Sequence, residues 1–87
     1  MVTIKRIVLD VLKPHHPDCL KFACTIAEKS PGIKVELTVD EIDEKTESII
    51  IVIEGESLDY DAIVEVITDL GGSVHSIDEV EVTSKPD

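Results

Sequence analysis

Three histidines and a run of acidic residues are the side chains of this chain with the most chemistry to offer. His15 and His16 follow the first predicted strand, His75 lies in the last one, and acids crowd the turn between the two middle strands, at 40–47. Carboxylates alone suit Ca²⁺ or Mg²⁺, and histidines among them would also admit Zn²⁺. We therefore expect a divalent cation, Ca²⁺ or Mg²⁺ before Zn²⁺, and no organic cofactor. The expected metal ligands are Asp10, Asp40, Asp43, Glu47 and His75.

A purely structural interpretation competes with this metal site. The stretch 40–44 lacks the alternating acids and the glycine of an EF-hand loop, and the spacing matches no other ligand motif. An acidic hairpin that is simply solvated, with the adjacent histidines in a polar loop, explains the same residues. A second group of acids is the weaker candidate, because Asp59 already fits a helix N-cap. Its members are Glu54, Glu56, Asp59 and Asp61.

The sequence contains no evident catalytic constellation, so we expect a protein that is not an enzyme. Gly71-Gly72 closes a helix and forms no phosphate loop, and no Ser/His/Asp or Cys/His arrangement follows from the spacing. An acylphosphatase, which shares the predicted architecture, would need an asparagine, and this chain has none. A histidine acting as a general base is the enzymatic alternative. One Phe, one Tyr and a net charge of -11 argue against a nucleic-acid partner.

The composition is that of a globular protein, which we expect to be cytoplasmic. The 87 residues include 19 acids against 8 Lys and Arg, and no apolar run approaches the ~20 residues of a membrane helix. We expect no signal peptide, no membrane partner, and two reduced thiols, Cys19 and Cys24, that behave as small buried apolar side chains. The absence of Asn, Gln and Trp, together with abundant Glu and Ile, suggests a thermophile.

Hydrophobic periodicity predicts the elements that must position these side chains. It predicts strands at 3–12, 33–43, 49–53 and 73–83, the last with a bulge near 75–79, and helices at 17–29 and 58–70. The order β-α-β-β-α-β is that of the ferredoxin-like sandwich, an α+β fold with a four-stranded antiparallel sheet and two helices on one face. One domain, 1–83, and a C-terminal tail, 84–87, account for the chain.

The strand 49–53 should lie in the centre of this sheet. Because it is apolar without alternation, both of its faces should be covered. Ile49, Ile51 and Ile53 would face the helices, and the other face would carry an apolar patch that a monomer leaves wet. We therefore expect a homo-oligomer, in which Arg6 pairs with an acid of a neighbouring subunit. The expected interface residues are Ile4, Val8, Leu12, Ile50 and Val52.

Several segments together carry a resemblance to a known family. They are LDVLKPH at 9–15, Thr46-Glu47 before the isoleucine strand, Ile53-Glu54-Gly55 after it, Gly71-Gly72, and HSIDEV at 75–80. In order and at matching length, these segments resemble the small archaeal proteins catalogued as domain of unknown function 211. The resemblance implies a ferredoxin-like fold, a ring-like homo-oligomer and bound divalent cations such as calcium, and it implies no catalytic residues.

The expected function is therefore that of a non-enzymatic, acidic domain that forms a ring-like homo-oligomer and binds divalent cations. Carboxylates gathered near subunit boundaries would share a cation, which couples the metal to assembly. The alternative is a small-molecule-binding regulatory module with ligand sites at its subunit interfaces.

Overall fold

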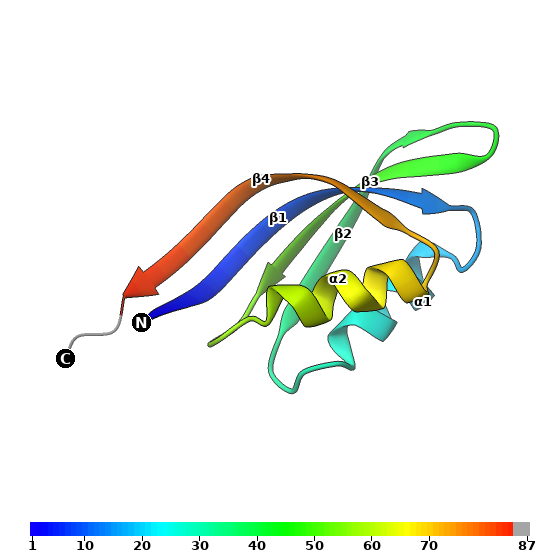
Figure 1. The fold of residues 1–87 in the computed structure, drawn as a ribbon. Helices are drawn as coiled ribbons and strands as arrows, with labels where there is room; N and C mark the ends of the chain where they lie inside the picture. Colours follow the sequence, from blue (N-terminus) through cyan, green and yellow to red (C-terminus); the bar gives the residue numbers. More distant parts are fainter. Residues whose placement is uncertain (85–87) are drawn as a thin grey trace.

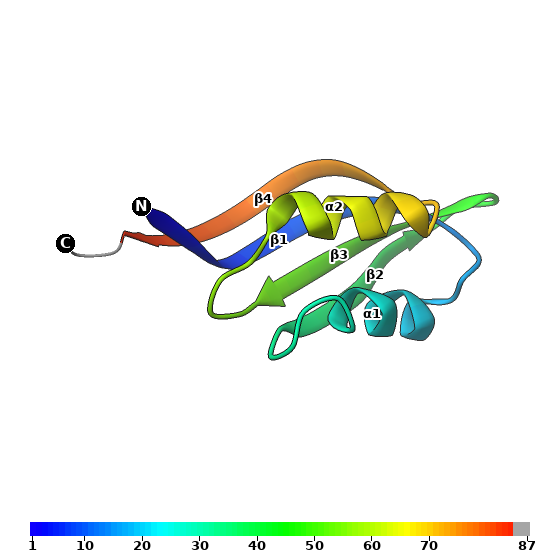
Figure 2. The ribbon, with the colours of Figure 1, turned by 60° about the horizontal axis from the view of Figure 1, so that its bottom comes forward.

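The computed structural model describes residues 1–84 and contains every predicted strand and helix. The elements are β1 Val2–Pro14, α1 Cys19–Ala27, β2 Lys34–Ile42, β3 Thr46–Glu54, α2 Tyr60–Asp69 and β4 Ser73–Ser84. The strands form one antiparallel sheet in the order β2-β3-β1-β4. Both helices cover the same face of this sheet, and β1 and β4 continue past them as a two-stranded arm (Figures 1 and 2). The predicted ferredoxin-like fold is confirmed.

The core lies between the two helices and the inner face of the sheet. Alternation along β1 turns every second side chain inward, and the central strand β3 pairs with it so that Leu9 lies opposite Ile51. The helices contribute apolar stripes that cover these strands. The fully or almost fully buried core residues are Ile7, Leu9, Val11, Phe22, Ile26, Ile49, Ile51, Ile53, Leu58, Ile63, Val66 and Ile67.

Both helices begin at an aspartate N-cap, which the sequence predicts for Asp59. The Asp18 carboxylate accepts a hydrogen bond from the Lys21 N–H at 2.8 Å, and the Asp59 carboxylate accepts one from the Ala62 N–H at 3.2 Å. Each bond satisfies a backbone donor that the first helical turn leaves free. At the other end of α2, Gly71 has φ +88°, the left-handed conformation that stops a helix at glycine.

The strands extend further than the periodicity predicts. β1 continues to Pro14 and β3 starts at Thr46, so Lys13 pairs with Glu47 across the two strands. β4 includes Ser84, the first residue of the predicted tail, while 85–87 lie outside the described residues. Within the described part of the chain, neither helix has the length and apolarity needed to cross a bilayer.

Irregular pairing between β1 and β4 changes which face some side chains occupy. β4 carries one unmatched residue at His75 and another at Asp78, which confirms the predicted bulge. β1 has its own unmatched residue at Lys5, and beyond it Ile4 packs against the core. The prediction that Ile4 lies on the uncovered face of the sheet is therefore wrong, because a bulge shifts the inward and outward alternation by one residue.

Candidate functional site

The predicted metal ligands are distributed over both faces of the sheet. Asp10 and His75 line a hollow of about 320 Å³ on the uncovered face, together with Leu12 and Ser48. Glu47 lies on the helix-covered face, since it pairs with the buried Lys13. Asp40 and Asp43 are exposed near the β2–β3 turn. Among residues 1–84, no three His, Cys, Asp or Glu side chains come close enough together to hold a metal ion.

Glu47 is instead part of a polar cluster that the sequence analysis did not identify. The centre of the cluster is Lys13, whose side chain is 0% exposed. Its Nζ donates to the Pro14 carbonyl at 2.8 Å and to the Glu47 carboxylate (Oε1) at 3.2 Å. The Phe22 ring lies beneath it, with its centroid 5.8 Å from Nζ. The buried Lys13 ammonium therefore has the hydrogen-bond partners that it needs, and it links the end of β1 to the start of β3.

His15 connects the same carboxylate to the β2–β3 hairpin. Its Nδ1 lies 2.9 Å from Glu47 Oε2, and its Nε2 lies 2.9 Å from the Glu44 carbonyl oxygen. The carbonyl accepts only, so Nε2 carries a proton, and the protonated ring can donate to both oxygens. The hydrogen bond that His15 donates to the Glu47 carboxylate raises the pKa of His15, and the Glu44 carbonyl contributes further. His15 in turn lowers the pKa of Glu47, and Lys13 adds to this effect.

Cys19 completes the cluster at the start of α1. Its Sγ donates to Glu47 Oε1 at 3.6 Å, and burial raises the pKa of this thiol. A raised thiol pKa disfavours the thiolate, which is the nucleophilic form. Cys24 is exposed, so the prediction that both cysteines are buried is wrong for this residue. Both thiols are free, as predicted.

The cluster has the chemistry of a structural link between β1, the following loop and β3, and it includes one histidine whose pKa is raised by its carboxylate partner. Its cation and carboxylate are matched, and its thiol is held protonated, so the arrangement stabilises the loop 15–18 against β3. A signal for it exists in the sequence. Lys13 continues the inward series of Ile7, Leu9 and Val11, and the register between β1 and β3 brings Glu47 opposite to it.

The face of the sheet turned away from the helices, here called the open face, is the second candidate site. The register arranges its side chains in rows that run across the four strands. The first row is Lys34, Glu54, Arg6 and Glu81; the second is Glu36, Val52, Val8 and Glu79; the third is Thr38, Ile50, Asp10 and Ser76; the fourth is Glu41, Ser48, Leu12 and Ser73. Apolar side chains therefore occupy the middle of this face, and acids and hydroxyls surround them.

Four of the five predicted interface residues lie on the open face. Ile50 and Val52 are partly buried and Leu12 is 41% exposed, as expected for side chains without a helix above them. Val8 is only 6% exposed within a single chain. The prediction that a monomer leaves Val8 wet is therefore wrong, since Val8 lies on an inner strand with Val52 and Glu79 beside it. Ile4, the fifth residue, belongs to the core side.

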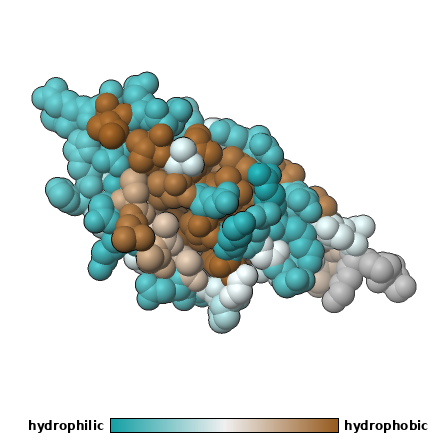
Figure 3. All heavy atoms as spheres, turned by 180° about the vertical axis from the view of Figure 1, so that it is seen from behind, coloured by the Kyte–Doolittle hydropathy of each residue, from teal (hydrophilic) through white to brown (hydrophobic). Residues whose placement is uncertain are grey.

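Other apolar side chains remain exposed beside the core. Ile77, Val80 and Val82 of β4 lie opposite inward-facing residues of β1, but they are 51%, 59% and 52% exposed. All three belong to β4, the edge strand that forms the long arm with β1 (Figure 1). On the β2 and α1 side of the molecule, brown apolar surface gathers between polar margins (Figure 3). Val39 of β2 and Leu20 of α1 are among the exposed apolar residues.

The fold and its polar and apolar surfaces define this chain as a ferredoxin-like α+β domain with one uncovered sheet face. Residues 5–85 match the family DUF211, described as uncharacterized ArCR, and the chain belongs to this family. The uncharacterized protein MJ0319 of Methanocaldococcus jannaschii is 49% identical over 82 residues, which are 94% of this chain and 84% of the relative. The resemblance found in the sequence is confirmed.

Proposed function

We propose that this protein is a non-enzymatic, acidic domain that assembles with itself into a ring-like homo-oligomer and binds divalent cations. The observation that carries the proposal is the open face. It presents Ile50, Val52 and Leu12 without a covering helix, in a sheet whose other face carries the core and both helices. An apolar group of this kind on an antiparallel sheet is typical of an interface.

The apolar strip on β4 supports more than one contact between copies. Ile77, Val80 and Val82 are each more than half exposed, and they lie on the face of the sheet opposite to Ile50 and Val52. β4 is also an edge strand, so its outer backbone groups are available for pairing with another chain. Two distinct contact surfaces are what a closed ring of copies requires.

The charge of the chain supports a role for divalent cations in this assembly. Each copy carries a net charge of -11, so copies that approach one another repel. The open face carries the carboxylates of Glu36 and Glu79 on its two edge strands and that of Asp10 on the inner strand β1. Since one chain does not group three ligands within residues 1–84, a cation would be shared by carboxylates of adjoining copies.

Sedimentation velocity at micromolar concentration, with Ca²⁺ or Mg²⁺ and then with EDTA, tests this proposal. We expect an oligomer with the cation and a smaller species with the chelator, because the cation screens the repulsion between acids. Na⁺ at the same ionic strength serves as the control for general screening. A protein that is monomeric under all of these conditions would contradict the proposal. An oligomer whose size is the same with and without EDTA would contradict the proposed role of divalent cations.

A further inference from the structure

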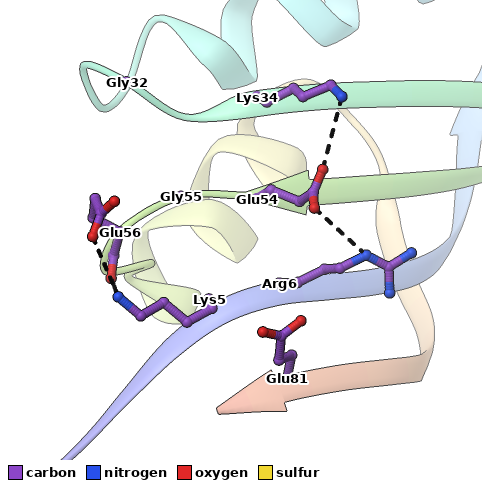
Figure 4. A pocket seen from close by; sticks show the side chains of 8 residues that line it. All are labelled: Lys5, Arg6, Gly32, Lys34, Glu54, Gly55, Glu56 and Glu81. Carbon is purple, nitrogen blue, oxygen red and sulfur yellow. Dashed lines mark hydrogen bonds and ion pairs between the residues drawn. The ribbon is translucent and has the colours of Figure 1, made fainter. Parts of the chain in front are cut away.

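One row of the open face alternates in charge across the whole sheet. Lys34 of β2, Glu54 of β3, Arg6 of β1 and Glu81 of β4 lie side by side, because Lys34 and Arg6 both pair with Glu54 and Arg6 also pairs with Glu81. The order of charges from β2 to β4 is plus, minus, plus, minus. Figure 4 shows Glu54 between Lys34 and Arg6, with Glu81 on the far side of Arg6. We call these residues the charged row.

The charged row gathers cations in a protein that has few of them. Lys34 and Arg6, together with Lys5, line one hollow of about 390 Å³, although the chain has only 8 Lys and Arg against 19 acids. Within one chain their pairing along the row is loose. Glu54 lies 3.9 Å from both Lys34 Nζ and Arg6 Nε, and its side chain is 44% exposed. Exposed pairs at such distances contribute little to the stability of a monomer.

Because its charges alternate, the charged row is complementary to the same row of a second copy in which the strand order is reversed. A two-fold axis that runs parallel to the strands, between two facing sheets, reverses the order of the strands in the second copy. Lys34 then lies opposite Glu81 of the second copy, and Arg6 lies opposite Glu54 of the second copy. The symmetry repeats both pairs, so four ion pairs form across the contact. Sheets that pack in this way keep their strand directions within about 30° of each other.

The second row fits the same arrangement. Its two central residues, Val52 and Val8, come opposite one another between the copies. Val8 is only 6% exposed, so the apolar surface that this row offers to the second copy is mainly that of Val52. Its outer residues, Glu36 and Glu79, come together at the rim. Each of them already has a cation of its own chain, since Glu36 Oε1 lies 3.7 Å from Lys34 Nζ and Glu79 Oε1 lies 2.8 Å from Arg6 Nη1.

The other orientation of two facing sheets lacks this match. A two-fold axis perpendicular to the strands would place the charged row against the fourth row, which consists of Glu41, Ser48, Leu12 and Ser73. That row offers one acid and no cation, so Glu54 and Glu81 would be left without partners. The charges therefore favour the axis parallel to the strands.

We propose that the open face is the contact surface of a two-fold symmetric pair of this chain, in which Lys34 meets Glu81 and Arg6 meets Glu54 of the second copy. The inference rests on the proposed self-assembly and specifies its surface and orientation. Such a pair is closed on itself, so the ring consists of pairs that are joined through a different surface.

Charge reversal at the two ends of the row tests the orientation. Lys34 and Glu81 lie on opposite edge strands, about 14 Å apart at the usual strand spacing, so they do not pair within one chain. K34E alone and E81K alone each place two like-charged pairs in the homodimer, and we expect at least a tenfold increase in the dimer Kd for each. Mixed K34E and E81K form a heterodimer with all charges matched, and we expect its Kd to return to within about threefold of the wild type.

Native mass spectrometry, with one variant isotopically labelled, measures the fractions of the two homodimers and the heterodimer. K29E and E65K are the matched controls, because they make the same charge changes at exposed positions outside the sheet. Mixing the controls should give a statistical distribution. Thermal unfolding of each variant checks that the fold is kept, as expected for Lys34, whose side chain is 66% exposed.

Two outcomes would overturn the inference while the proposed function stands. In one, the wild type assembles and K34E and E81K assemble as well as their controls. In the other, the dimer Kd of each variant is raised, and mixing the two variants does not lower it. A wild-type protein that stays monomeric overturns both proposals together, so the two failures are distinguishable. A mixture that is enriched in the heterodimer above the statistical fraction supports the pairing of Lys34 with Glu81 between copies.

Discussion

The Glu47 carboxylate holds the buried Lys13 ammonium at 3.2 Å, although the two residues lie 34 positions apart in the chain. The other Glu47 oxygen lies 2.9 Å from His15, so one carboxylate links the end of β1, the following loop and the start of β3. The hairpin that contains Asp43 and Glu44 is attached to the body of the protein through this link, since His15 also contacts the Glu44 carbonyl.

The pH dependence of stability should reflect the His15–Glu47 pair. The folded state raises the pKa of His15 above 6.5, so its contribution is complete below that pH and is lost as the pH rises through the raised value. The folded state lowers the pKa of Glu47 below 4.5, so its contribution is complete above that pH and is lost as the pH falls through the lowered value. We expect the pair to stabilise the folded protein most between these two pH values, where both contributions are complete. Thermal unfolding from acid to alkaline pH measures this. H15Q should remove the alkaline loss and reduce the acid loss, because His15 is the main cause of the lowered Glu47 pKa and Lys13 remains as the second.

Substitution of Glu47 should destabilise the protein by leaving the buried Lys13 ammonium without its anionic partner. We expect E47Q to lower the Tm by at least about 5 °C at neutral pH, because the neutral amide binds the ammonium less well. E44Q is the control, since only the backbone carbonyl of Glu44 takes part in the cluster. Equal Tm values for the two variants would show that Lys13 does not need the Glu47 charge.

Removal of the α2 cap should weaken the protein measurably. D59A deletes the acceptor of the Ala62 N–H, which costs roughly 1 kcal/mol of unfolding free energy. D59N keeps an oxygen at the same place and should stay within a few tenths of a kcal/mol of the wild type. Urea unfolding of both variants compares them directly, and identical midpoints for D59A and the wild type would contradict the capping role.

Two glycines with positive φ provide a test of local packing. Gly71 and Gly32 have φ values of +88° and +84°, so alanine at either one is strained by roughly 1–2 kcal/mol. A Cβ at Gly71 would also lie 3.2 Å from Pro14 Cγ, whereas a Cβ at Gly32 meets nothing within 4 Å. We therefore expect G71A to lose more unfolding free energy than G32A. Equal losses of unfolding free energy in the two variants would mean that Pro14 moves aside at no cost in free energy.

A charge placed on the open face should affect assembly more than folding. I50K puts an ammonium among side chains that would be buried between copies, so we expect the oligomer to dissociate while the circular dichroism spectrum of the fold is retained. L20K is the control, because Leu20 of α1 is 75% exposed. Size-exclusion chromatography with light scattering distinguishes the variants. An I50K protein that assembles like L20K would contradict burial of this face.

Much of the fold follows from local signals that act over a few residues. Asp18 and Asp59 cap the helices, Gly71 ends α2, and the broken alternation at 75–79 marks the bulges of β4. The apolar run 49–53 identifies a central strand, β3. Ile49, Ile51 and Ile53 are buried beneath the helices, while Ile50 and Val52 are partly buried on the open face. These features depend on backbone hydrogen bonding and side-chain period, which the sequence displays directly.

The candidate sites were less predictable. Glu47 was expected among the metal ligands, but it pairs with Lys13, because the register of β1 and β3 places both of them on the helix-covered face. Ile4 was expected on the open face, but the unmatched Lys5 reverses its direction. Val8 was expected to be exposed, but it is 6% exposed on an inner strand, between Val52 and Glu79.

The sequence alone determined the elements, their order and the family, since short-range patterns and the resemblance suffice for these. Only the tertiary structure decided which charges meet: Lys13 with Glu47, and Lys34 beside Glu54 and Arg6. The reason is physical. Cross-strand neighbours are set by register and bulges, and a shift of one residue moves a side chain to the opposite face of the sheet.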